Sequence, residues 1–195
     1  MHHQGVVAEA ALLANASLTG LLKDRPGDPL LVLMIDRVQD PQNLGNIYRT
    51  AEAAGVSLVF LPAKSTASHQ LATVSKASAG AVEHVPTVVV SSLKQPAQEL
   101  HAAGFHIFGL DMEGATGLWQ ADFPARTALL VGAEGAGLGA AARSLCDSFV
   151  SVPMLGKVQS LNVTNAVAVV FYEVVRGRKT LRAEGLGPRA EGQSP

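Results

Sequence analysis

The sequence predicts an α/β domain with a mainly parallel, six-stranded sheet covered by helices. Two observations carry this prediction. Short apolar runs recur along the chain and are separated by amphipathic stretches, which is the alternation typical of a helix-covered parallel sheet. The chain has 195 residues, of which 48% are hydrophobic and 16% are charged, so it can bury the core of such a domain.

The predicted elements alternate along most of the chain. Buried strands are expected at residues 30–35, 57–61, 87–90, 106–110, 127–131 and 149–152. Helices are expected at residues 44–54, 70–78, 93–103, 139–146 and 162–178. Ligands of open parallel sheets bind at the carboxyl ends of the strands, so the loops after Ile35, Val131 and Val152 are the candidate sites.

The two ends of the chain differ from this pattern. Residues 1–29 combine a weak helical pattern with a polar turn, which predicts a leader or linker remnant that docks on the domain or joined it to another part. Residues 181–195 are rich in Gly, Glu and Pro, and we expect a disordered tail there. The folded domain is therefore predicted to span residues 30–180.

Composition argues against several classes of protein. The formal net charge of −1 gives no global attraction for nucleic acid, and the basic cluster from Arg176 to Arg189 fits a solvated helix end better than a phosphate site. Cys146 is the single cysteine, so an internal disulfide and a thiolate metal site are both excluded, and we expect no metal. No apolar run approaches the roughly 20 residues that span a bilayer, and no secretory signal is evident, which predicts a cytoplasmic protein.

The loop after the first strand carries a polar pair. With a helix beginning near Leu44, Asn43 is expected to cap it, and Arg49 lies nearly two turns further on. The helix is otherwise lined with small residues that permit close packing. Either the arginine is held for chemistry, or it forms an ordinary surface pair with Glu52 or Asp36.

The loop after the fifth strand is rich in glycine. Residues 131–139 hold four glycines around Glu134, and Gly135, Gly137 and Ala140 satisfy a loose dinucleotide-binding pattern. We reject that interpretation because the following strand runs into Pro153 and Met154 with no carboxylate at its end. The glycines fit better with a backbone that approaches a ligand or another backbone closely.

The loop after the sixth strand places Ser160 and Asn162 just before an apolar helix. Backbone donors are unpaired at a helix start, so this cluster could bind a ligand there. Simple capping of the helix explains one such residue equally well.

Together these loops resemble the three motifs of the SpoU (TrmH) family of RNA ribose 2′-O-methyltransferases, a branch of the SPOUT superfamily. The matching segments are 43–45 (Asn-Leu-Gly) with 49–51 (Arg-Thr-Ala) and Gly55, then 132–138 (Gly-Ala-Glu-Gly-Ala-Gly-Leu), then Pro153, Met154 and Gly156 with 160–163 (Ser-Leu-Asn-Val) and 172–173 (Tyr-Glu). Residues 74–86 further resemble the subgroup that methylates a guanosine of 23S ribosomal RNA. The N-terminal RNA-binding domain usual in that subgroup has no counterpart here, which suggests a shortened form.

The resemblance implies a C-terminal deep trefoil knot that binds S-adenosylmethionine, and a homodimer with the active site at its interface. It implies that the cofactor is held around Gly132, Val152, Met154 and Leu161, with Leu110 and Gly109 as further candidates. It also implies a polar catalytic set around the reactive ribose hydroxyl: Arg49, Asn43, Glu134, Ser160 and Asn162.

Other functions stay open at this point. Transfer RNA is the alternative substrate of the same chemistry. A non-catalytic RNA-binding or ribosome-assembly factor would keep the fold without turnover, although the retained polar set argues against it. A nucleotide-dependent oxidoreductase would require an acidic residue that the sequence does not place at the expected strand end.

Overall fold

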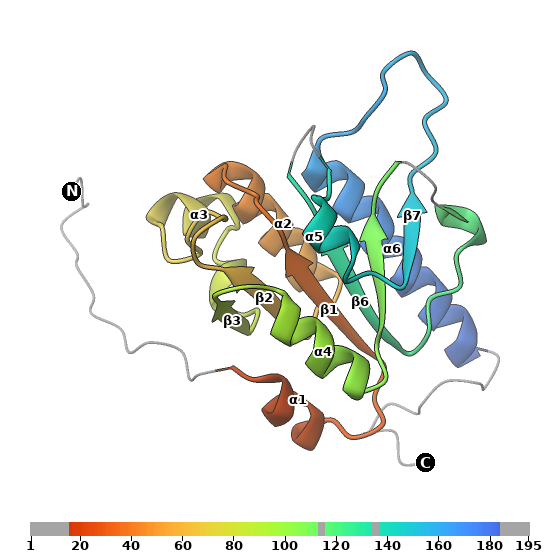
Figure 1. The fold of residues 1–195 in the computed structure, drawn as a ribbon, viewed down its shortest axis with the longest axis horizontal. Helices are drawn as coiled ribbons and strands as arrows, with labels where there is room; N and C mark the ends of the chain where they lie inside the picture. The colour runs from red at the N-terminus through yellow and green to blue at the C-terminus, as the bar shows by residue number, and fades with distance from the viewer. Residues whose placement is uncertain (1–15, 113–115, 134–136, 184–195) are drawn as a thin grey trace.

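A parallel sheet forms the centre of the protein in the computed structural model, which describes residues 16–112, 116–133 and 137–183 (Figure 1). Within these residues the sheet has seven strands in the order β3-β2-β1-β6-β4-β7-β5, and each neighbouring pair is parallel. The strands are β1 (Leu30–Ile35), β2 (Leu58–Pro62), β3 (Thr87–Val90), β4 (His106–Leu110), β5 (Thr116–Gly117), β6 (Arg126–Val131) and β7 (Ser148–Ser151). The predicted α/β class and parallel sheet are thus confirmed.

The prediction of six strands was wrong by one. The additional strand, β5, is only two residues long and pairs with the end of β7. An edge strand of this length buries too little side-chain surface to leave an apolar run in the sequence, so pattern analysis could not find it.

Helices cover both faces of the sheet. They are α1 (Leu18–Asp24), α2 (Pro41–Ala53), α3 (Ala72–Ala77), α4 (Lys94–Ala102), α5 (Ala140–Arg143) and α6 (Val163–Ala183), with short 3₁₀ turns η1 (Ala81–Glu83) and η2 (Leu118–Gln120). None of the helices in the described part of the chain is long and apolar enough to cross a membrane.

The fully buried strand β1 explains why the domain has three layers. All six of its residues are buried, and their side chains point alternately to the two faces. Leu31, Leu33 and Ile35 belong to the core beneath α2 and α6, whereas Leu30, Val32 and Met34 belong to the core beneath α4 and α5. Figure 1 shows these two helix pairs on opposite faces of the sheet.

Helix α2 begins earlier than its apolar pattern predicts. Asp40 is the N-cap, and its carboxylate accepts a hydrogen bond of 2.9 Å from the backbone N–H of Gln42. Pro41 occupies the first turn, where its fixed φ and missing N–H are tolerated. The expectation that Asn43 caps this helix was therefore wrong, and Asn43 lies inside the first turn.

The two ends of the described chain pack on the domain. Leu18 of α1 is buried in the core beneath α4, so the segment before β1 docks on the domain, which is one of the two roles expected for it. Helix α6 continues to Ala183, past the position where the tail was predicted to begin. Residues 1–15 and 184–195 lie outside the described residues.

The contact between α2 and α3 depends on a glycine, and a matched pair of substitutions tests this. A Cβ on Gly45 would lie 2.5 Å from the Cβ of Ala77 and 2.9 Å from the carbonyl oxygen of Val74. We expect Gly45→Ala to lower the free energy of unfolding by about 1–2 kcal/mol, because overpacking outweighs the better helix propensity of alanine. Urea denaturation measures the change.

Gly177→Ala in α6 is the control, because a Cβ at Gly177 meets nothing within 4 Å. This variant should be stabilised by about 0.5–1 kcal/mol through the reduced backbone entropy of the unfolded chain. Equal effects of the two substitutions would show that the approach of α3 places no constraint on Gly45.

Candidate active site

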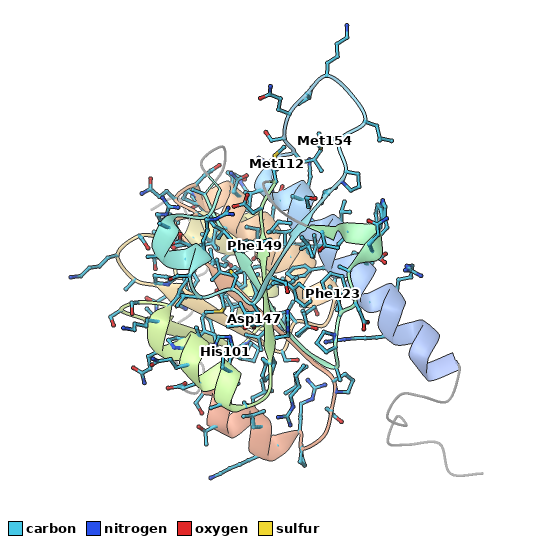
Figure 2. All side chains as sticks on the ribbon, turned by 45° about the vertical axis from the view of Figure 1, so that its right-hand side comes forward. His101, Met112, Phe123, Asp147, Phe149 and Met154 are labelled. Carbon is cyan, nitrogen blue, oxygen red and sulfur yellow. The ribbon has the colours of Figure 1, made fainter. Side chains whose placement is uncertain are left out.

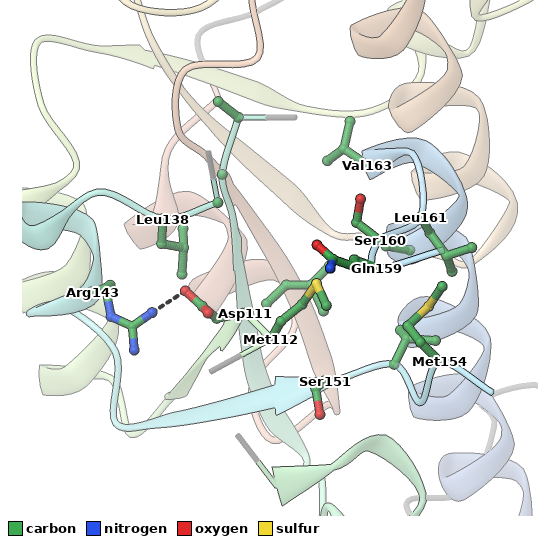
Figure 3. Close-up of a pocket in the computed structure, with 16 residues that line it drawn as sticks. Asp111, Met112, Leu138, Arg143, Ser151, Met154, Gln159, Ser160, Leu161 and Val163 are labelled. Carbon is green, nitrogen blue, oxygen red and sulfur yellow. Dashed lines mark hydrogen bonds and ion pairs between the residues drawn. The ribbon is translucent and has the colours of Figure 1, made fainter. Parts of the chain in front are cut away.

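A cavity of about 820 Å³ opens at the carboxyl ends of β4, β6 and β7 (Figure 3). These strands are neighbours in the sheet, so the loops that follow them meet although they are far apart in the sequence. Leu110 lies at the end of β4, Gly132 directly follows β6, and Val152 directly follows β7. Figure 2 shows Met112 and Met154 at this same end of the molecule.

The wall that follows β6 is made of closely packed backbone. A Cβ on Gly132 would collide with the carbonyl group of Gly137, so only glycine fits at this position. Gly137 has a φ of +60° and donates its N–H to the carbonyl of Ala133 at 3.0 Å, which turns the chain back on itself. The expected close approach of two backbones is therefore present. Glu134, a predicted catalytic residue, lies outside the described residues.

The segment between β7 and α6 forms the opposite wall. Val152, Met154, Ser160 and Leu161 all line the cavity, as Figure 3 shows for the last three. The middle of the segment reaches out into solvent, where the side chain of Leu155 is 98% exposed.

Asn162 joins the first and third motifs. Its side-chain Nδ2 donates to Oδ1 of Asn43 at 3.3 Å, across 119 residues of sequence. Its Oδ1 accepts from the backbone N–H of Thr164 at 2.9 Å and so caps α6. The capping interpretation of this cluster is thus confirmed for Asn162, and Ser160 lines the cavity, where the ligand-binding interpretation would place it.

Two other predicted residues lie elsewhere. Arg49 is exposed on α2 and does not line the cavity. Within the described chain its side chain has no hydrogen bond or ion pair, so the alternative of a surface pair with Glu52 or Asp36 is wrong. Gly109 is buried inside β4, where a Cβ would press on Phe149, Cys146 and Leu138. Its position is explained by packing behind the cavity wall.

Sequence analysis missed the charged pair of the cavity. Asp111 and Arg143 form an ion pair on its wall and are the only charged residues among its described lining (Figure 3). The guanidinium carbon of Arg143 also lies 4.6 Å from the centre of the Phe149 ring, a favourable cation–π contact. Asp111 directly follows a correctly predicted strand, so its place at a carboxyl end could have indicated it.

Cys146 lies close to this pair, but its thiol is unreactive. Burial raises the pKa of its thiol to about 12, and the negative charge of Asp147 acts in the same direction. The thiol therefore stays protonated near neutral pH and is no nucleophile. In the three described ranges, no group of three or more His, Cys, Asp and Glu side chains could hold a metal ion.

The SpoU rRNA Methylase family matches residues 30–172, which is most of the chain. The chain belongs to this family. Membership confirms the enzyme class expected from the three motifs, an S-adenosylmethionine-dependent RNA 2′-O-ribose methyltransferase.

Similar SpoU proteins are known from several bacteria. The 23S rRNA (guanosine-2′-O-)-methyltransferase RlmB of Ralstonia nicotianae is 43% identical over 183 residues, which cover 93% of this chain and 73% of that protein. The structure of the SpoU methyltransferase AviRb from Streptomyces viridochromogenes, solved with AdoMet, is 34% identical with a TM-score of 0.72, over 78% of this chain and 62% of AviRb. The TrmH/SpoU tRNA modifying enzyme of A. aeolicus is 25% identical with a TM-score of 0.69, over 88% of this chain and 85% of that one.

The cavity of this SpoU protein suits S-adenosylmethionine. Its volume lies within the range of about 300–1,000 Å³ typical of small-molecule sites. Apolar side chains such as Leu138, Val152 and Leu161 can cover a purine, and the backbone at Gly132 can approach it closely because no side chain intervenes. The Asp111–Arg143 pair adds complementary charges for a ligand that carries both signs.

Gly132 provides a direct test of the cavity. We expect Gly132→Ala to weaken the binding of S-adenosylhomocysteine more than tenfold, because the added methyl group displaces the Gly137 backbone and with it one wall. Isothermal titration calorimetry measures the affinity, and the melting temperature of the free protein confirms folding.

Gly156→Ala is the matched control in the third motif, since a Cβ at Gly156 has nothing within 4 Å. Its affinity should equal that of the wild type. Unchanged affinity in Gly132→Ala would place the ligand elsewhere.

Proposed function

We propose that this protein transfers the methyl group of S-adenosylmethionine to a ribose 2′-hydroxyl of RNA, at a guanosine of 23S ribosomal RNA. The observation that carries the proposal is the convergence of the family's three motif loops at one edge of the sheet, where two line the cavity and the Asn43–Asn162 hydrogen bond ties in the third. The name of the Ralstonia relative, at 43% identity, supports the guanosine substrate. Because the substrate is ribosomal RNA, we also place the protein in the cytoplasm.

The cavity residues hold the cofactor in this proposal. Gly132, Val152, Met154, Leu161 and Leu110 surround it, and all five line the cavity. When bound, S-adenosylmethionine supplies a sulfonium methyl group that is open to attack by an oxygen nucleophile. The protein then contributes chiefly by placing the nucleophile in line with that group, which can account for several kcal/mol of the barrier.

The polar residues orient the ribose. Asn162 and Asn43 are fixed against each other, and Ser160 faces the cavity beside them, so this junction can hold a hydroxyl group in one position. A guanidinium is a poor base. We therefore assign Arg49 to binding an RNA phosphate and stabilising the oxygen as it loses its proton, with Glu134 completing the set.

The position of Arg49 supports a homodimer. Arg49 does not line the cavity of its own subunit, so the second subunit can supply it across an interface. Exposed apolar side chains offer such an interface on α6 and the loop before it: Tyr172 is 54% exposed, Val158 68% and Leu155 98%. Patches of this kind on soluble proteins mark interaction surfaces.

We further propose that the C-terminal segment forms the deep trefoil knot expected from the family. Membership in the family supports it, as does the glycine-only passage of backbone against backbone at Gly132 and Gly137. True knots are otherwise nearly absent from proteins. A cofactor that binds to both the loop after β6 and the loop after β7 would give a reason for a knot here.

Transfer RNA is the second candidate substrate. The tRNA modifying enzyme of A. aeolicus resembles this chain over 88% of its length. Mass mapping of ribosomal and transfer RNA from cells that lack this protein separates the two. One missing ribose methyl group at a guanosine of 23S ribosomal RNA is expected, and a loss confined to transfer RNA would replace the first proposal with the second.

Substitution of Arg49 separates catalysis from cofactor binding. We expect Arg49→Ala to reduce methyl transfer at least a thousandfold, which corresponds to about 4 kcal/mol of transition-state stabilisation, through loss of phosphate binding and oxyanion stabilisation. Affinity for S-adenosylhomocysteine should stay within about twofold of the wild type, because Arg49 does not line the cavity. A tritium-transfer assay and calorimetry measure the two quantities.

Arg25→Ala is the control for that variant, since Arg25 is another exposed arginine and lies at the end of α1. It should retain full activity. A large loss of cofactor affinity in Arg49→Ala would contradict the assigned role.

A further inference from the structure

Arg37 has an unusual backbone conformation directly beside the site. Its φ is +58°, and apart from Ala79 it is the only residue other than glycine with a positive φ in the described part of the chain. This left-handed region is unfavourable for a side chain as large as arginine. Such strain persists where surrounding contacts enforce it, and it is concentrated at functional sites.

The contacts that hold Arg37 connect two of the motif loops. Its Nε donates to Oδ2 of Asp36 at 2.9 Å, and its Nη2 donates to the carbonyl of Gly137 at 3.2 Å, one hundred residues away. The turn itself is tied to β6, because the N–H of Asp36 donates to the carbonyl of Val131 at 2.8 Å. Residue 37 therefore reaches the glycine-rich loop from a fixed base at the end of β1.

The loop is shaped to receive this side chain. A Cβ on Gly139 would lie 3.0 Å from Nη2 and 3.3 Å from Cζ of Arg37, so the absence of a side chain there lets the backbone pack on the guanidinium. The carbonyl that Arg37 binds is the one that faces Gly132 across the narrow gap. Arg37 thus fixes the orientation of the peptide group that forms the wall.

Arg37 itself does not line the cavity, whereas Gly132, Gly137 and Leu138 do. Its effect on a ligand must therefore pass through the loop. A loop that already has its bound conformation loses less conformational entropy when a ligand arrives, and the affinity is higher by that amount.

We propose that Arg37 is a positioning residue that holds Gly137, and through it the cavity wall at Gly132 and Leu138, in the form that binds S-adenosylmethionine. The inference rests on the proposed function and adds to it a residue outside the three motifs. The strained backbone places the guanidinium where it can bind Asp36 and Gly137 together.

Arg37→Asn tests the proposal. Asparagine tolerates the left-handed conformation, but its side chain is too short to reach Gly137. We expect the Kd for S-adenosylhomocysteine to rise about tenfold, as for loss of one charge-assisted hydrogen bond. The KM for S-adenosylmethionine should rise in parallel, while kcat at saturating cofactor and the melting temperature of the free protein stay close to the wild type.

Arg37→Gly is the second variant. Glycine removes the backbone strain, so the free protein should melt at or above the temperature of the wild type while the cofactor binds about tenfold more weakly. Stability and affinity then move in different directions, which a merely structural role for Arg37 would not produce.

Arg25→Asn is the matched control. Arg25 is similarly exposed, 45% against 38% for Arg37, and also pairs with a nearby carboxylate, that of Asp28 at 3.0 Å. Its side chain donates to Asp28 and Ser57 and, among the described residues, not to the glycine-rich loop, so the substitution should leave the cofactor affinity unchanged.

The outcomes distinguish this inference from the function beneath it. Wild-type affinity in both Arg37 variants would overturn the positioning role while leaving the methyltransferase proposal intact. A fall in melting temperature that accompanies weaker binding in both variants would also overturn it, by showing a general role in stability. Failure of the wild-type protein to bind S-adenosylhomocysteine would overturn both proposals.

Discussion

The passage of one backbone against another at Gly132 is the constraint on which the site depends. No side chain fits between Gly132 and the carbonyl of Gly137, so the two segments lie closer than any pair of larger residues would allow. Because Gly132 directly follows β6 in the middle of the sheet, this close contact sets where the rest of the loop can lie. Both glycines line the cavity, and Arg37, which does not line it, binds the same carbonyl.

The sheet supplies the fixed frame for this contact. β6 lies between β1 and β4, so the ends of three strands deliver Asp36, Gly132 and Asp111 to one edge. The helices add a second tie, since the capping residue of α6 reaches the first turn of α2. The Arg37–Gly137 and Asn162–Asn43 hydrogen bonds each join segments about one hundred residues apart. The geometry of the site therefore depends on the fold of the whole domain.

Sequence patterns predicted the elements well where burial is strong. β1, β3 and β4 have the predicted boundaries, because parallel strands buried on both faces leave continuous apolar runs. The start of α2 was misplaced because Asp40 and Pro41 carry no apolar periodicity, although both are typical of a helix start.

The loops of the site were identified by residue type, but the pairings between them were not. A pairing such as that of Arg37 with Gly137 depends on which strands are neighbours, and strand order has no local pattern in sequence. The Asp111–Arg143 pair was missed for the same reason, whereas β5 was missed because a two-residue strand leaves no apolar run.

The place of β6 also bears on how the chain folds. β1 pairs with β2 soon after both have been synthesised, but its other neighbour, β6, begins ninety-six residues after β1, with β4 made in between. One edge of β1 and one edge of β4 therefore stay unpaired until Arg126–Val131 inserts between these strands. Non-local pairing of this kind slows folding and leaves apolar surface exposed to solvent until the pairing is complete. During translation, then, the nascent polypeptide stays vulnerable to aggregation until Val131, the last residue of β6, has been made.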